Sequence, residues 1–277
     1  MFKILSKRAL AANEFDLWID APHIARNGHA GQFCVLRVNE NGERIPLTVA
    51  DYDREGGRIR MIFQTVGKTT TALGKLEVGD CIHDILGPLG TPSEIKNYGT
   101  VLMVGGGVGI AALYPIIKAL KLAGNKVITI LGGRTSNLVV MKEECAEYSD
   151  ELIVTTDDGS EGIKGVVTTA MDMLAERGEK IAYCWAIGPS IMMKFASLKA
   201  KELQIPCWVS LNPIMIDGTG MCGCCRVTVN DTIRFACVDG PEFDGWGVNW
   251  NEFMTRLRQY KDEEKISLDK YKSEVGE

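Results

Sequence analysis

The stretch Val101–Ile110 reads VLMVGGGVGI and decides the fold of this chain. Four apolar residues of strand character run into four glycines, and a helical pattern follows over 111–122. A strand that turns tightly into a helix directs backbone N–H groups and the helix N-terminus at a diphosphate. Ile110 stands where a G-x-G-x-x-G motif has its last glycine, so a purely structural turn is the alternative. The candidate nucleotide-binding residues are Gly105, Gly106, Gly107, Val108 and Gly109.

The alternation of strand and helix continues after this turn. β-prone segments at 126–131, 151–155 and 181–187 alternate with helix-like segments around 137–148 and 166–177. This rhythm is typical of an open parallel sheet whose two faces are covered by helices.

Before the turn, the chain is expected to form a small β-barrel. Short β-prone runs such as Phe33–Val38 and Arg58–Phe63 are separated by Gly, Asn and Asp. Their turns recur at the spacing of a small barrel. We therefore predict a β-barrel plus α/β architecture with a small C-terminal module, divided as follows: barrel 1–97, parallel-sheet domain 98–206, Gly/Cys-rich module 207–245 and polar helical tail 246–277.

Composition excludes several classes of function. A chain of 277 residues predicts two or three domains, and 45% hydrophobic with 24% charged residues is ordinary for a globular protein. The net charge of −5 argues against nucleic acid or an anionic membrane surface as the main partner. No stretch approaches the roughly 20 apolar residues that span a bilayer. The N-terminus lacks a signal-peptide layout, so we expect a cytoplasmic protein.

Four of the nine cysteines, Cys222, Cys224, Cys225 and Cys237, lie within sixteen residues. Three of them form the pattern Asp217-x4-Cys222-x2-Cys225-x11-Cys237. Plant-type [2Fe–2S] ferredoxins use C-x4-C-x2-C and a distant fourth cysteine. The same spacing fits here with Asp217 in the first position. Nearby glycines give the loop the backbone freedom to fold around a cluster. The candidate ligands are Asp217, Cys222, Cys225 and Cys237.

The clustered thiols are also compatible with three alternatives. A Zn²⁺ site could use the same ligands. A redox disulfide is less favoured, because the C-x-x-C does not open a helix of a βαβ unit. The third alternative is a chance grouping of buried thiols. Cys224 is expected to be non-ligating, and the isolated cysteines are expected to be small buried hydrophobes: Cys34, Cys81, Cys145, Cys184 and Cys207.

A third motif lies in the barrel, where Arg44–Thr48 reads RIPLT and Gln64–Thr70 reads QTVGKTT. An Arg can clamp a diphosphate, and a Thr hydroxyl can hydrogen-bond a ring nitrogen. Taken alone, Pro46 could equally mark an edge strand, and 66–70 could be an ordinary turn.

Taken in chain order, these motifs resemble the ferredoxin–NADP reductase superfamily. The chain is more similar to dihydroorotate dehydrogenase electron-transfer subunits, and most similar to small subunits of bifurcating NADH-dependent reduced ferredoxin:NADP oxidoreductases. The resemblance covers about 1–245 and is carried by these segments: Gly31–Phe33, Arg44–Thr48, Val66–Thr70, Gly87–Gly90, Gly105–Ala111, Thr156–Ser160, Gly188-Pro189 and the cysteine loop.

The resemblance implies three cofactors, namely FAD, NAD(H) and a [2Fe–2S] cluster. It implies that Pro46, Leu47 and Thr48 line the isoalloxazine, with Thr48 near its reactive nitrogen as the catalytic residue. It further implies that Arg44, Gly67, Thr69 and Thr70 hold the diphosphate, and that Thr65 and Val66 also belong to the cofactor-binding site. The chain departs from the family at Ile45, where the usual Arg would stand, and at Ile187, where relatives often have Cys.

Asp157 and Asp158 follow the strand that ends near 155 and predict NAD(H) rather than NADP(H). A carboxylate can accept a hydrogen bond from a ribose 2′-OH but repels a 2′-phosphate. Arg134 could suit NADP, and we interpret it instead as a contact to the diphosphate or adenosine. Gly188 and Pro189 complete the expected nicotinamide site.

Asp217 favours the bifurcating oxidoreductase, because the dihydroorotate relatives normally use four cysteines. The resemblance then implies a large partner subunit that carries another flavin and [4Fe–4S] clusters and handles NADPH and ferredoxin. A dihydroorotate dehydrogenase subunit is the second hypothesis. A stand-alone NADH-dependent reductase and a zinc-stabilised binding module are the remaining ones.

Overall fold

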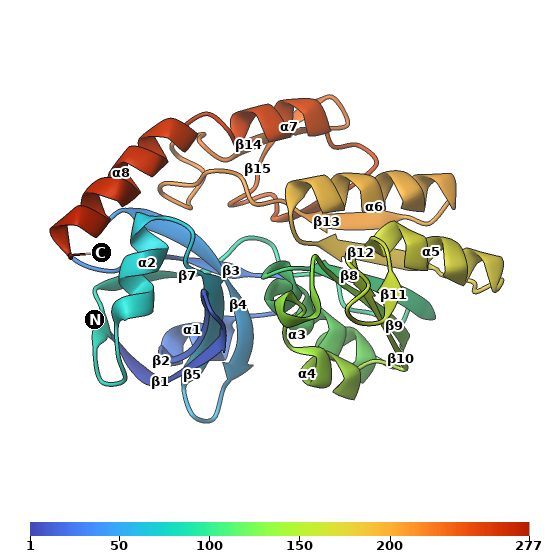
Figure 1. Cartoon of the computed structure of the whole chain (residues 1–277), viewed down its shortest axis with the longest axis horizontal. Helices are drawn as coiled ribbons and strands as arrows, with labels where there is room; N and C mark the ends of the chain where they lie inside the picture. Colours follow the sequence, from blue (N-terminus) through green and yellow to red (C-terminus); the bar gives the residue numbers. More distant parts are fainter. Residues whose placement is uncertain (277) are drawn as a thin grey trace.

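The computed structural model describes residues 1–276 and consists of two seven-stranded sheets, a small hairpin module and a helical tail (Figure 1). The predicted barrel and the predicted parallel sheet are both present. They lie side by side, and the module and tail arch over both of them.

The first sheet is antiparallel and forms the barrel, with strand order β6-β1-β2-β5-β4-β3-β7. Its strands are β1 (Phe2–Ala11), β2 (Glu14–Asp20), β3 (Phe33–Arg37), β4 (Arg44–Asp53), β5 (Arg58–Gln64), β6 (Cys81–Ile82) and β7 (Asp84–Leu89). Two helices belong to this part, α1 (Pro22–Asn27) and α2 (Lys68–Lys75). Strand residues alternate between the two faces, so Cys34 and Leu36 enter the barrel core, while Phe33 and Val35 join a second core outside the barrel.

The second sheet has the order β11-β10-β9-β8-β12-β13-β16 and is parallel except for β16. Its strands are β8 (Thr100–Gly106), β9 (Lys126–Gly133), β10 (Glu151–Thr156), β11 (Ile163–Lys164), β12 (Tyr183–Ile187), β13 (Cys207–Ser210) and β16 (Glu242–Asp244). Its helices are α3 (Gly109–Leu122), the 3₁₀ turn η1 (Ser136–Leu138), α4 (Lys142–Glu147), α5 (Val167–Glu176) and α6 (Ser190–Glu202).

Helices cover both faces of this sheet, which explains its continuous apolar strands. Val101 and Met103 of β8 pack in the core on the α3 side, whereas Leu102 and Val104 pack with α5 and α6. A strand buried on both faces has no polar side to present to water.

The module between β13 and β16 contains a two-stranded hairpin, β14 (Arg226–Val229) and β15 (Thr232–Phe235). Its turn residues Asn230 and Asp231 have φ of 49° and 57°. Asn and Asp tolerate this left-handed conformation, which two-residue hairpin turns require.

The tail forms two helices, α7 (Trp250–Arg256) and α8 (Lys261–Glu274). Asn249 caps α7 by accepting a hydrogen bond from the Glu252 N–H at 3.1 Å. Helix α8 crosses from the module to the barrel and passes over α2 (Figure 1), where the Lys75 ammonium lies 5.2 Å from the centre of the Tyr271 ring.

Four of the five isolated cysteines are buried, as predicted: Cys34, Cys145, Cys184 and Cys207. The prediction was wrong for Cys81, which is exposed. Strand β6 is a two-residue strand at the edge of the barrel sheet, and only its Ile82 points into the core. Within 1–276, no helix has the length and apolar character needed to cross a membrane.

Candidate functional site

Strand β4 directs the residues of the barrel motif to opposite faces. Ile45 and Leu47 pack against the barrel core, so Arg44, Pro46 and Thr48 alternate onto the outer face. Pro46 lies in the part of β4 that pairs with β3 alone, because the pairing of β4 with β5 covers only Val49–Asp53. The side chain of Leu47 points inward, which leaves only its backbone for contact with a ligand on the outer face.

The second barrel motif opens helix α2. The hydroxyl of Thr70 accepts hydrogen bonds from the N–H groups of Val66 and Gly67, at 3.1 and 3.0 Å. The Thr69 hydroxyl donates to the Glu43 carboxylate at 3.1 Å, and the Lys68 ammonium lies 3.5 Å from the same carboxylate. A helix N-terminus with hydroxyl and ammonium donors favours an anion. In this structure the anion is the Glu43 carboxylate. The Thr69 hydroxyl, the Lys68 ammonium and the start of α2 are donors of the kind that a diphosphate needs.

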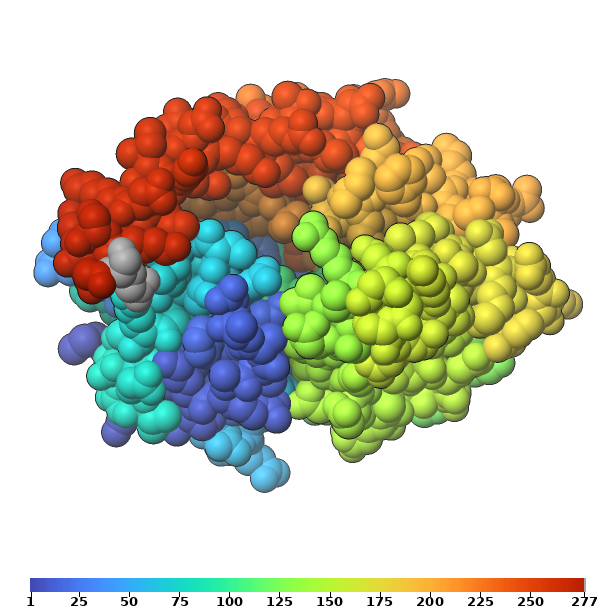
Figure 2. Space-filling view, in the orientation of Figure 1, coloured from blue at the N-terminus to red at the C-terminus, as the bar shows by residue number. Residues whose placement is uncertain are grey.

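A cavity of about 560 Å³ lies beside this strand. Its walls come from three parts of the chain, namely 43–46 of the barrel, 212–216 of the module, and Leu257 with Glu264 of the tail. Figure 2 shows the hollow beneath the red C-terminal segment. Its volume is within the usual range for cofactor sites. The residues predicted for FAD that line it are Arg44 and Pro46.

The glycine-rich turn between β8 and α3 packs against the turn that follows β12. A Cβ on Gly109 would lie 2.5 Å from the Gly188 Cα, and a Cβ on Gly188 would lie 2.9 Å from the Gly106 carbonyl oxygen. These glycines therefore allow two backbone turns to touch. The predicted diphosphate residues and the predicted nicotinamide residues Gly188 and Pro189 thus meet at the carboxyl end of the sheet, where open α/β sheets bind ligands.

The predicted ribose residues lie on the neighbouring strand ends. The N–H groups of Asp157 and Asp158 bond the carbonyls of Gly133 and Arg134, at 3.1 and 3.3 Å. Asp157, Asp158 and Arg134 are all exposed. The Asp158 carboxylate accepts from the Ser160 N–H at 2.9 Å, and contacts with Ser160 hold the pKa of Asp158 below its usual value. Asp157 has no side-chain hydrogen bond among the described residues, so its carboxylate is available to a ligand.

The loop that carries Asp217 is held by its own backbone. The Asp217 carboxylate accepts hydrogen bonds from the N–H groups of Thr219 and Cys222, both at 2.9 Å. These bonds keep the pKa of Asp217 below its usual value. Cys225 and Cys237 are buried, with their Sγ atoms 3.2 Å apart.

The four predicted ligands do not converge in this structure. Among the described residues, no three His, Cys, Asp or Glu side chains are arranged to hold a metal ion. Three thiols and a carboxylate carried by one irregular loop and the adjoining hairpin fit an iron–sulfur cluster in donor type. Cys224 is half-buried, and its carbonyl accepts a hydrogen bond from Arg256 at 3.0 Å.

The cysteine loop packs directly on the barrel. A Cβ on Gly218 would lie 2.9 Å from Val35 Cγ2 and 2.8 Å from Leu89 Cδ1. Val35 is the cross-strand partner of Pro46. The loop and the outer face of β4 are therefore neighbours.

Sequence reasoning missed several residues of the cavity. Glu43, Ile214, Leu257 and Glu264 carry no motif, and the last two reach the cavity only because the tail folds back over the barrel. Ile216 could have been found, because it directly precedes the first predicted ligand.

Comparison with known proteins identifies this arrangement. The model for the iron–sulfur cluster binding domain of dihydroorotate dehydrogenase B matches residues 212–249, and the oxidoreductase NAD-binding domain matches residues 103–198. A relative from Thermotoga maritima, named dihydroorotate dehydrogenase B (NAD(+)), electron transfer subunit homolog, is 58% identical over 275 residues, which are 99% of this chain and 97% of the relative. The chain belongs to the family of dihydroorotate dehydrogenase B electron-transfer subunits and their homologues.

Two further relatives refine the comparison. A solved structure described as the NADH-dependent reduced ferredoxin–NADP oxidoreductase, from a study of flavin-based electron bifurcation, is 57% identical, with a TM-score of 0.93 over 98% of both chains. The dihydroorotate dehydrogenase B electron transfer subunit of Desulforamulus reducens is 32% identical over 90% of this chain and 97% of its own length.

These matches confirm the predicted ferredoxin–NADP reductase-like fold and the prediction of an electron-transfer oxidoreductase subunit. They also confirm the predicted classes of cofactor, namely flavin, nicotinamide nucleotide and iron–sulfur cluster. The relatives are named as electron transfer subunits. The domain boundaries and the individual site residues stay predictions.

Proposed function

We propose that this chain is the small electron-transfer subunit of a bifurcating NADH-dependent reduced ferredoxin:NADP oxidoreductase. The observation that carries the proposal is the whole-chain match at 57% identity and a TM-score of 0.93. The dihydroorotate subunit of Desulforamulus reducens is only 32% identical. Asp217, which stands where the four-cysteine pattern has its first cysteine, supports the same choice.

The flavin site proposed here is the outer face of β4 with the start of α2. Pro46 and Thr48 would lie against the isoalloxazine, and the Thr48 hydroxyl would hydrogen-bond its reactive nitrogen. Arg44 and the α2 residues Thr69 and Thr70 would hold the diphosphate, which would displace the Glu43 carboxylate from its present donors. The cavity under the tail would exclude water from one side of the flavin.

FAD, when bound, supplies the chemistry that exchanges a hydride with NAD(H) and single electrons with the cluster. The protein contributes position. The turn at 105–109 and Gly188-Pro189 would present the nicotinamide, and Asp157 would accept a hydrogen bond from the adenosine ribose. The packing of Gly218 on Val35 supports electron transfer between flavin and cluster, because it brings the ligand loop to the flavin strand.

The proposed cluster is [2Fe–2S], ligated by Asp217, Cys222, Cys225 and Cys237. The proposed partner is a large subunit with its own flavin and [4Fe–4S] clusters, which handles NADPH and ferredoxin in the cytoplasm. Large apolar side chains are exposed on the module and could meet such a partner: Ile216, Met221, Ile233 and Val238.

Optical spectra with iron, zinc and flavin analysis of the purified chain test this proposal. We expect one FAD and two irons per chain, little zinc, and flavin that is bleached by NADH. A colourless zinc protein would contradict the proposal and favour the binding module.

A second candidate is the electron-transfer subunit of an NAD-dependent dihydroorotate dehydrogenase, which the names of the relatives favour. Co-purification of the native partner separates the two. A partner that couples NADH to ferredoxin and NADP supports the first candidate, and one that oxidises dihydroorotate supports the second. A chain that purifies alone and reduces a soluble acceptor would indicate a stand-alone reductase.

A further inference from the structure

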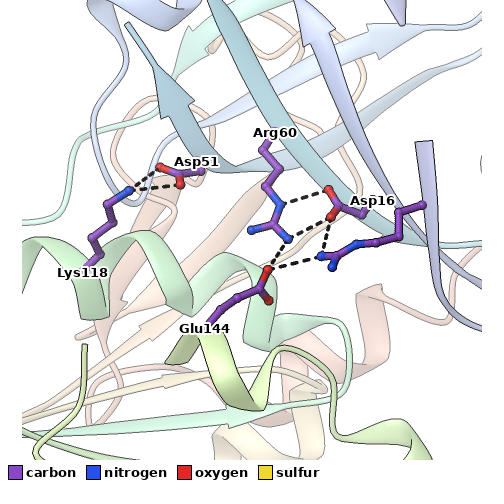
Figure 3. Close-up of polar contacts among 6 residues, drawn as sticks. Asp16, Asp51, Arg60, Lys118 and Glu144 are labelled. Atoms are coloured by element: carbon purple, nitrogen blue, oxygen red, sulfur yellow. Dashed lines mark hydrogen bonds and ion pairs between the residues drawn. The ribbon is translucent and has the colours of Figure 1, made fainter. Parts of the chain in front are cut away.

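The barrel and the nucleotide sheet share an apolar interface that is flanked by two sets of ion pairs (Figure 3). Ala50 and Ile62 of the barrel are buried in the same core as Ile110 and Leu113 of α3. The ion pairs fix how the barrel and the nucleotide sheet are placed relative to one another. Oppositely charged groups must lie opposite each other, whereas apolar surfaces can slide past one another.

The first set joins Lys118 of α3 to Asp51 of β4. The Lys118 Nζ lies 3.1 Å from both carboxylate oxygens of Asp51. The two side chains are 31% and 19% exposed. Lys118 also lies 5.9 and 5.8 Å from the ring centres of Tyr114 and Tyr148. The ammonium is therefore confined on several sides.

The second set joins Arg60 of β5 to Glu144 of α4. The buried Arg60 guanidinium makes two hydrogen bonds to Asp16, at 3.0 and 2.8 Å, and a third to Glu144 at 2.8 Å. Arg8 reaches the same two carboxylates. Burial disfavours the Arg60 charge, but Asp16 and Glu144 outweigh it and raise the pKa of Arg60.

The Lys118–Asp51 pair connects the two elements that carry the proposed reacting groups. Helix α3 begins at Gly109, in the proposed nucleotide turn, nine residues before Lys118. Strand β4 contains Thr48, the proposed flavin contact, three residues before Asp51. These separations are about 14 Å along a helix and about 10 Å along a strand. The ion pair therefore ties α3 to β4 between the proposed nucleotide turn and the proposed flavin contact.

We infer that Lys118 and Asp51 are positioning residues that set the nicotinamide against the flavin. The inference rests on the proposed function and adds the device that aligns its two reactants. Arg60 and Glu144 hold the far side of the same interface. Neither Lys118 nor Asp51 belongs to the proposed binding sites, so their loss should misalign the reactants without emptying either site.

Stopped-flow reduction of the FAD-loaded full chain by NADH tests the inference. Lys118→Met keeps the apolar stem but removes the charge, and Asp51→Asn removes the other charge. Each should lower the limiting rate of flavin reduction by about tenfold or more, because a misplacement near 1 Å can cost that much. The apparent Kd for NADH and the FAD content should change by less than about twofold, because the binding groups are untouched.

Two variants control for charge and stability. Lys118→Arg should restore the rate to within about threefold, because the guanidinium can reach the same carboxylate. Lys121→Met, on the same helix, breaks an ion pair with Asp150 inside the nucleotide domain and should leave the rate unchanged. The long-wavelength charge-transfer absorbance of NADH with oxidised flavin should weaken in Lys118→Met. It should be unchanged in Lys118→Arg and in Lys121→Met.

The outcomes distinguish a failure of the inference from a failure of the proposed function. If NADH reduces the wild-type flavin and both Lys118→Met and Asp51→Asn match the wild type, the inference is overturned and the proposed function stands. Equal losses of rate in Lys118→Met and Lys121→Met would also overturn it, because helix stability would then be the cause. If NADH fails to reduce the wild-type flavin, the proposed function itself is overturned.

Discussion

Gly218 of the cysteine loop packs against Val35 of β3, with no room for a side chain between them. Val35 pairs with Pro46, so this contact joins the proposed cluster loop to the proposed flavin strand. The φ of Gly218 is 77°, a left-handed conformation that side chains disfavour.

Substitution of Gly218 tests this contact. Gly218→Ala should lower the free energy of unfolding by about 2–4 kcal/mol, from backbone strain together with the clash on Val35 and Leu89. Gly79→Ala is the matched control, because Gly79 has φ of 100° with open space around it, and it should show the strain alone. Denaturant titration measures both variants. Equal losses would mean that the contact with Val35 has no energetic weight.

The role of Asp217 is tested by iron content. Asp217→Cys should keep a cluster with altered electron paramagnetic resonance g-values, since thiolate is a softer ligand of the same charge. Asp217→Ala should lose or destabilise the cluster while FAD stays bound, and Cys224→Ala should be nearly silent. An unchanged spectrum and iron content in Asp217→Ala would make Asp217 an ordinary loop residue.

Nucleotide preference should depend on Asp157 more than on Asp158. The Asp158 carboxylate is engaged by Ser160, whereas that of Asp157 is free of side-chain hydrogen bonds among the described residues. Asp157→Ser should narrow the preference for NADH over NADPH by about tenfold, or about 1.4 kcal/mol. Asp158→Ser should change it less. Flavin reduction rates with each nucleotide provide the measurement, and the reverse ranking would contradict the assignment.

The tail should help to retain FAD, because Glu264 of α8 lines the cavity beside β4. Glu264→Ala should weaken FAD binding by about threefold, the loss of a modest polar contact. Its neighbour Glu263, which does not line the cavity, provides the control variant Glu263→Ala. Flavin fluorescence during dilution reports release. Identical retention in both variants would show that α8 does not contact the cofactor.

Stability should fall as pH rises through the folded-state pKa of Glu242. This carboxyl is bonded by Ser93 and, at 3.1 Å, by Trp185, and it joins the barrel, the sheet and the module. Burial raises the pKa of Glu242 above 4.5 despite these two donors. Because this pKa is higher in the folded state, the folded state keeps the Glu242 proton up to a higher pH than the unfolded state does. The contribution of Glu242 to the free energy of unfolding is therefore fully present at low pH and is lost as the carboxyl ionises.

We expect the melting temperature of the wild type to decline as pH rises above 4.5, and Glu242→Gln should flatten this decline. Thermal melts across that range measure the effect. A decline of the same size in both proteins would assign it to another group.

Local patterns in the sequence determined the two sheets and the classes of cofactor, although helices α1 and α2 interrupt the barrel segment that was predicted to be strands. The glycine turn after Val101–Val104 predicted a nucleotide-binding sheet, and D-x4-C-x2-C-x11-C predicted the cluster loop, because spacing along one short segment constrains what that segment can bind. Cys81 was misjudged, because its mixed neighbours Asp80 and Ile82 do not reveal that the strand is short and lies at a sheet edge.

Only the tertiary structure decided how these parts meet. The side chain of Leu47 points into the barrel because the pairing of β4 with β3 sets which residues face inward. Glu264 reaches the cavity because α8 folds back over α2, and Lys118 meets Asp51 across 67 positions of sequence. Such contacts depend on the packing of whole elements, which no pattern within a single segment specifies.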